Sequence, residues 1–167
     1  EGSRRVLVFL PKWHNGVDRP ATIAMMRALG TQPGLHVVVA GHIRASDTAL
    51  TAEEVAELSA LPSLQFVGST WSSIDVITWC EVLIDVDSSI AFDAVLLGKP
   101  YVRPRYLQDA SVETVWDRLG GAHQPMSLEE TVKLLTGASL APAARDASFD
   151  RVVFGGPGTE VLARYRD

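Results

Sequence analysis

The sequence predicts a doubly wound α/β fold, in which a Rossmann-like parallel sheet is covered by helices on both faces. Short β-branched apolar runs alternate with helical patterns along the 167 residues, and this alternation is typical of β-α-β units. The runs are almost continuously apolar, as strands buried on both faces are. Hydrophobic residues make up 47% of the chain and charged residues 21%, which indicates a globular protein of one domain at this length.

Five apolar runs are predicted to be strands, because each is too short for a helix and ends at a turn or a polar segment. Pro11 closes the first run, and the last run follows Pro100. The predicted strands are Arg5–Leu10, Leu35–Ala40, Leu64–Val67, Glu81–Asp85 and Tyr101–Arg103.

The helices between the strands carry start and stop signals. Thr51 with Glu54, and Ser127 with Glu130, form capping boxes, and Gly30 is a typical C-terminal stop. The predicted helices are Arg19–Leu29, Thr51–Ala60, Ser73–Trp79, Ser89–Leu97, Val112–Leu119, Ser127–Gly137 and a final broken pair, Asp146–Phe154 and Thr159–Arg166. Helices in these places supply the crossovers that parallel strands require.

Composition and charge exclude several classes of protein. The formal net charge of −5 argues against a nucleic-acid-binding surface, so no nucleic-acid partner is expected. Cys80 is the single cysteine, which excludes an internal disulfide and fits a reducing, cytoplasmic compartment. No apolar run has the ~20 residues that a membrane span needs. The chain opens at Glu1 without a start Met, so we expect it to be a piece of a longer protein.

The segments that follow the strands form the candidate site, because ligands of such sheets bind beyond the carboxyl ends of the strands. These segments carry imidazoles, hydroxyls and guanidinium groups: His14, His42, Ser69, Thr70, Ser88, Ser89, Arg103 and Arg105. Basic groups gathered at one edge of an acidic chain favour an anionic ligand. The histidines have no metal-ligand spacing, so no metal site is predicted.

The most informative local pattern is Ser88–Ser89 at the predicted start of a helix. The first amides of that helix, as far as Ile90, lack intrahelical partners, and the positive end of the helix dipole faces the crevice. A phosphate can accept hydrogen bonds from such amides and hydroxyls. The alternative is that the serines only cap the helix. Asp93 shares a helix face with Ser89, where it either pairs structurally or accepts from a ligand hydroxyl.

The segment Asp87-Ser88-Ser89-Ile90-Ala91-Phe92-Asp93-Ala94, followed by Leu97-Gly98-Lys99-Pro100, resembles the donor-binding half of GT-B glycosyltransferases. In particular it is similar to the CDP-glycerol glycerophosphotransferase and capsule or teichoic-acid polymerase group. Pro11-Lys12-Trp13-His14 stands where that group has Pro-Thr-Trp-Arg, and His42-Ile43 stands where it has a His-Pro turn. The resemblance covers most of the chain.

The resemblance implies that residues 1–167 are a single nucleotide-donor-binding domain, the C-terminal half of a longer two-domain protein. That protein would be a glycosyl- or glycerophosphotransferase making a cell-surface polysaccharide or a teichoic-acid-type polymer. Its substrate would be a nucleotide-diphosphate donor such as CDP-glycerol or a UDP-sugar, with no further cofactor. The fragment would bind the donor but would not be active without the N-terminal acceptor domain, through which the full-length protein would associate with the inner face of the membrane.

The resemblance and the strand-end positions together assign site residues. His42 would be the catalytic imidazole that stabilises the departing nucleotide phosphate. The candidate donor contacts are Ser88, Ser89, Ile90, Asp93, Arg103, Arg105, His14, Ser69 and Thr70. Arg103 or Arg105 would neutralise the charge that develops on the diphosphate, and Asp93 would accept from donor hydroxyls.

Other interpretations stay open. Asp85-Val86-Asp87 matches the Asp-x-Asp of metal-dependent phosphatases, but the downstream aspartates, Asp117 among them, are scattered and form no second acidic cluster. A nucleotide-sugar 2-epimerase-like enzyme has the same architecture, and a non-catalytic nucleotide-binding module is a further alternative. Trp13 and Trp71 either stack on a nucleobase or cover the edge of the sheet.

Overall fold

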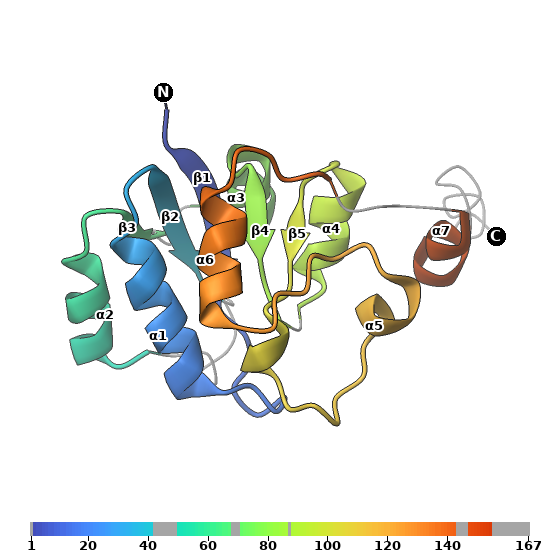
Figure 1. Cartoon of the computed structure of the whole chain (residues 1–167), viewed down its shortest axis with the longest axis horizontal. Helices are drawn as coiled ribbons and strands as arrows, with labels where there is room; N and C mark the ends of the chain where they lie inside the picture. The colour runs from blue at the N-terminus through green and yellow to red at the C-terminus, as the bar shows by residue number, and fades with distance from the viewer. Residues whose placement is uncertain (1, 42–49, 68–70, 87, 143–146, 155–167) are drawn as a thin grey trace.

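The structure is a computed structural model that describes residues 2–41, 50–67, 71–86, 88–142 and 147–154. A five-stranded sheet in the order β3-β2-β1-β4-β5 lies at its centre, with helices on both faces (Figure 1). Every pairing between neighbouring strands is parallel, which confirms the predicted doubly wound α/β fold. The strands are β1 (Arg4–Phe9), β2 (Leu35–Ala40), β3 (Leu64–Phe66), β4 (Val82–Ile84) and β5 (Tyr101–Val102).

Helices connect the strands and cover the sheet. In Figure 1, α1, α2 and α6 lie on the face toward the viewer, and α3 and α4 lie behind the sheet. The helices are α1 (Arg19–Gly30), α2 (Ala52–Ser59), α3 (Ser73–Trp79), α4 (Ile90–Leu96), the 3-10 helix η2 (Arg105–Leu107), α5 (Val115–Leu119), α6 (Leu128–Thr136) and α7 (Ala147–Phe154). The predicted terminal helix over 159–166 lies outside the described residues.

The largest difference from the predicted bounds is at a helix start. The fifth helix begins at Val115 and not at Val112, because the Asp117 carboxylate accepts from the Thr114 backbone N–H at 2.8 Å and caps the helix there. In α6, Ser127 caps as predicted, but the Glu130 carboxylate accepts from Met126 N at 2.6 Å, one residue before the expected partner. The short helix η2 was not predicted.

Alternate side chains of the central strands pack into two separate hydrophobic cores. On β1, Val6 and Val8 join the core under α1 and α6, whereas Leu7 and Phe9 join the core on the α3 and α4 side. This alternation follows from the two-residue period of a strand. Because both faces of these strands are buried, their sequences are continuous apolar runs.

The order of the strands reverses at β1, which pairs with β2 on one side and with β4 on the other. The chain runs outward from β1 through β2 to β3 and then crosses to β4. In parallel sheets a ligand crevice opens at such a switch point, beyond the carboxyl ends of the two strands. These ends face the bottom of Figure 1, because β1 starts at the N-terminus at the top. The segments after β1 and β4 therefore border the expected crevice.

Gly30, at the end of α1, has no room for a side chain. A Cβ added there would lie 2.6 Å from Leu61 Cδ1 and 3.1 Å from Leu64 Cβ. We expect Gly30→Ala to lower the free energy of unfolding by about 1–3 kcal/mol, the range for overpacking a core. Urea denaturation followed by circular dichroism measures this. Gly2→Ala is the control, because nothing lies within 4 Å of that position; equal midpoints for both variants would contradict the prediction.

Candidate functional site

Backbone hydrogen bonds join the segments after β1 and β5 at the carboxyl edge of the sheet. The Asp18 amide donates to Leu107 O at 2.7 Å and the Asp109 amide donates to Gly16 O at 2.8 Å. Val17 and Gln108 form an antiparallel bridge between the same two segments. The turn after β1, which carries His14, is thus held against the segment that contains η2.

The predicted site residues fall into three groups. His14, Ser89 and Asp93 are exposed, and Ser88 is half-buried, so these side chains are accessible to a ligand. Ile90 and Arg103 are buried, and Arg105 is largely buried. The remaining three, His42, Ser69 and Thr70, lie outside the described residues, so their assignment stays a prediction.

The start of α4 is capped by the chain itself. The Ser88 amide donates to Asp85 Oδ2 at 2.8 Å, and the Ile90 amide donates to Ser88 Oγ at 3.3 Å. Ser89, in the N-cap position, makes no side-chain capping bond. Two of the amides that we expected to face a phosphate, those of Ser88 and Ile90, therefore have partners in this structure. The hydroxyls of Ser88 and Ser89 are further donor groups at this helix start.

Asp85 has a role that the sequence left unassigned. Its side chain is almost completely buried at the end of β4, and its carboxylate lies at the N-terminal end of α4 through the bond to the Ser88 amide. The Tyr101 hydroxyl donates to the Asp85 carbonyl oxygen at 3.3 Å. The residue therefore organises the turn between β4 and α4, because its side chain accepts from the backbone amide three residues on.

Both arginines after β5 have internal partners. Arg103 Nη1 donates to Asp117 Oδ1 at 2.8 Å, and its guanidinium is fully buried. Arg105 donates to the carbonyl oxygens of Gln108, Asp109, Ala110 and Val112 at 3.0 to 3.1 Å. We expected these cations beside a diphosphate. The structure instead uses them to hold the segment between β5 and α5.

Asp117 is the residue in this region whose role sequence reasoning missed. It binds Arg103, lies 3.7 Å from Arg105 Nε and caps α5 through Thr114. Burial raises the pKa of the Asp117 carboxyl, but hydrogen bonds from Thr114 and Arg103 outweigh it, so the pKa lies below its ordinary value. The pattern Thr114-Val115-Trp116-Asp117 could have indicated the cap, but not the arginine partners.

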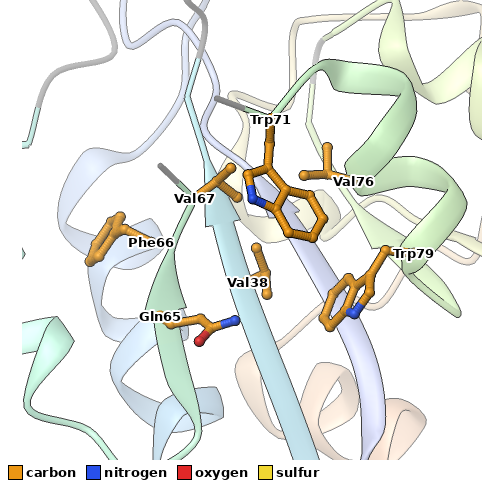
Figure 2. A pocket seen from close by; sticks show the side chains of 7 residues that line it. All are labelled: Val38, Gln65, Phe66, Val67, Trp71, Val76 and Trp79. Carbon is orange, nitrogen blue, oxygen red and sulfur yellow. The ribbon is translucent and has the colours of Figure 1, made fainter. Parts of the chain in front are cut away.

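A separate pocket of about 140 Å³ opens on the α3 side of the sheet, over β2 and β3. Figure 2 shows two indoles on the α3 side, Gln65 and Val67 on the β3 side and Val38 between them, with Phe66 pointing away. Trp71 is 48% exposed, whereas Trp79 packs edge-on against His36 at 5.2 Å. Trp71 is thus an accessible aromatic surface at the carboxyl side of this pocket.

Two kinds of feature are absent from the described ranges. No group of three or more His, Cys, Asp or Glu side chains there is placed to hold a metal ion. No helix in the same ranges has the length and apolar character to cross a bilayer.

Comparison with known proteins shows the fold class. No family model and no curated protein matches the sequence. Among solved structures, UDP-GlcNAc 2-epimerase from Neisseria meningitidis bound to UDP-GlcNAc matches 98% of this chain and 45% of its own, with a TM-score of 0.56 and 12% identity. The glycotransferase of kitacinnamycin matches with a TM-score of 0.52 and 16% identity, over 81% of this chain and 36% of its own.

The glycosyltransferase SnogD from Streptomyces nogalater also matches, with a TM-score of 0.51 and 19% identity, over 83% of this chain and 36% of its own. The chain therefore has the Rossmann-like fold of one half of a GT-B protein. It spans less than half the length of each of these three structures. At such identities the likeness concerns the fold alone.

Proposed function

We propose that the chain is the donor-nucleotide-binding domain of a glycosyl- or glycerophosphotransferase in the synthesis of a cell-surface polymer. The observation that carries the proposal is the placement of Ser88 and Ser89 at the start of α4, directly after β4 at the switch point of the sheet. The turn with exposed His14 follows β1, the neighbouring strand. In this proposal the domain is the C-terminal half of a longer protein whose other half supplies the acceptor site.

The diphosphate of the donor would lie between the β1 turn and the start of α4. The hydroxyls of Ser88 and Ser89 would donate to phosphate oxygens, and the His14 imidazole would add a donor from the opposite side. His42 would stabilise the departing phosphate, and Ser69 and Thr70 would contact the donor. Exposed Asp93 would accept from a donor hydroxyl.

The base of the nucleotide would stack on Trp71. This indole is half-exposed and lines the pocket of Figure 2. Gln65, with both an amide donor and an amide acceptor, lines the same pocket and could pair with the edge of a base. The choice between CDP and UDP would then depend on the hydrogen bonds made to that edge.

The second candidate is a nucleotide-sugar 2-epimerase-like enzyme. The epimerase structure supports it, because it matches 98% of this chain. A UDP-sugar assay on the full-length protein separates the two: epimerised sugar without transfer favours the epimerase, and transfer to an acceptor favours the transferase. Nucleotide binding without either activity indicates a non-catalytic module.

The proposed phosphate contacts are tested by single serine replacements. We expect wild-type protein to bind UDP or CDP in calorimetry, and Ser88→Ala and Ser89→Ala each to weaken binding about 5-fold, the equivalent of one hydrogen bond of ~1 kcal/mol. Only Ser88→Ala should also destabilise the fold, by about 1 kcal/mol, because only Ser88 bonds a helix amide. Ser139→Ala, at the opposite edge of the sheet, is the control.

Two results would contradict the proposal. The first is an absence of UDP and CDP binding by wild-type protein at millimolar ligand. The second is a loss of stability in Ser88→Ala with unchanged nucleotide affinity in both serine variants, which would leave the serines with a capping role only.

A further inference from the structure

One buried guanidinium binds four residues, which lie after β4, after η2, in α5 and after α5. Arg103 has no exposed surface. Its Nε donates to the carbonyl oxygen of Val86 at 3.4 Å. Val86 lies in the segment that connects β4 to Ser88. Its Nη1 donates to Asp117 Oδ1 at 2.8 Å and Gln124 Oε1 at 3.1 Å, and its Nη2 donates to Gln108 Oε1 at 2.5 Å.

Gln108 extends this network to the turn after β1. Its side chain is nearly buried, and its Oε1 accepts from Arg103 while its Nε2 donates to Asn15 O at 3.4 Å. Asn15 is the residue next to His14. A chain of side-chain hydrogen bonds therefore runs from the β4 segment, through Arg103 and Gln108, to the turn that carries His14.

The chemistry of these side chains suits a rigid link. A guanidinium is planar and presents its donors in a fixed fork, so Val86 O, Asp117 and Gln108 are held at set angles to one another. A lysine would keep the charge but not this geometry. The desolvation cost of a buried charge is offset only when its donors are paired. Displacing any of these segments would leave a buried donor unpaired, so displacement is unfavourable.

We propose that Arg103, acting through Gln108, is a positioning residue that sets the His14 turn against the start of α4. The donor affinity of the crevice then depends on two buried side chains that do not touch the donor. The donor part of this inference rests on the proposed function, whereas the placement of the turn does not.

Gln108→Glu and Gln108→Leu test the link in steps. Glutamate keeps an acceptor for Arg103 but cannot donate to Asn15 O, and leucine removes both bonds. We expect the amides of Asp18 and Asp109, which join the two segments, to exchange hydrogen at least tenfold faster in both variants. The amides of β1 and β2 should keep their wild-type rates. Gln32→Leu, a half-buried glutamine at the opposite edge, is the matched control.

Nucleotide titration separates positioning from mere stability. Gln108→Glu should weaken UDP or CDP binding at least fivefold while its urea midpoint stays close to wild type, since Arg103 keeps its partners. Arg103→Lys should weaken binding at least as much. Wild-type affinity in Gln108→Glu and Gln108→Leu would overturn the donor part of the inference.

Hydrogen exchange tests the placement of the His14 turn without a ligand. Unchanged exchange at Asp18 and Asp109 in both Gln108 variants would overturn the positioning role, whatever the nucleotide result. If wild-type protein binds neither UDP nor CDP, the proposed function fails and the donor part fails with it. Faster exchange would still support the role of Arg103 and Gln108 in placing the turn.

Discussion

Replacing Trp116 by alanine is expected to lower the free energy of unfolding by about 3–5 kcal/mol, the range for removing a large buried aromatic side chain. Trp116 is 4% exposed and is the central ring of an aromatic cluster. Its ring centroid lies 4.7 Å from that of Tyr101, 5.1 Å from Phe92 and 5.4 Å from Phe149. Because these residues belong to β5, α4 and α7, the indole joins three elements to α5, and its loss leaves a cavity among all of them.

Urea denaturation followed by far-ultraviolet circular dichroism measures the change, since removing a tryptophan alters fluorescence on its own. Trp71→Ala is the matched control, because its indole is half-exposed and exposed substitutions usually change stability by only about 0.5 kcal/mol. Trp116→Phe should recover part of the loss. Equal destabilisation by Trp116→Ala and Trp71→Ala would show that the aromatic cluster is not part of the stabilising core.

Asp117→Asn is expected to lower the free energy of unfolding at pH 7 by about 3 kcal/mol, the lower end of the range for breaking a buried ion pair. The lower end applies because the Asp117 side chain is 22% exposed, while its partner Arg103 is fully buried. Asparagine keeps the shape but has one acceptor oxygen, whereas both Asp117 oxygens accept, Oδ1 from Arg103 and Oδ2 from Thr114. The expected loss therefore combines the charge opposite a buried guanidinium with one hydrogen bond.

This loss should depend on pH in a defined direction. The pKa of Asp117 in the folded protein lies below its ordinary value of 3.8, so the carboxylate contributes stability above that value and loses it as the pH falls through the folded pKa. The difference between wild type and Asp117→Asn should therefore be constant near neutral pH and shrink below about pH 4. Asp93→Asn, at an exposed position, is the control.

Denaturation curves from pH 7 to pH 2.5 measure the difference directly. Other acids with lowered pKa values, such as Asp109 and Glu57, are present in both proteins and contribute equally to each. A difference that grows on acidification, or one that does not change with pH, would contradict the ion pair as the source of the stability.

The sequence contained enough information to predict the sheet. Runs such as Leu35–Ala40 are so apolar that only a strand buried on both faces accommodates them, and β2 has these bounds in the structure. Capping signals were equally local: Thr51 and Glu54 form the predicted capping box of α2. These features depend on residues close together in the chain, so the local sequence was sufficient to predict them.

The roles of Arg103 and Asp85 could not be predicted in the same way. A cation after a strand has the same local sequence whether it faces a ligand or is buried against a carboxylate, and Asp117 is 14 residues away from Arg103. Asp85 was recognised only as part of an Asp-x-Asp pattern. Its bond to the Ser88 amide depends on the turn between β4 and α4, which the pattern does not specify.

The sequence by itself determined the order of strands and helices along the chain, the parallel sheet and the polar residues that follow the strands at its carboxyl edge, because periodicity and turn residues act over a few neighbouring positions. Only the tertiary structure decided which polar groups at that edge remain accessible. Arg103 and Asp85 are buried and Arg105 is largely buried, whereas His14, Ser89 and Asp93 are exposed. Burial and hydrogen-bond pairing depend on segments that meet only when the chain is folded, since a buried charge must find its partner wherever the fold brings one near.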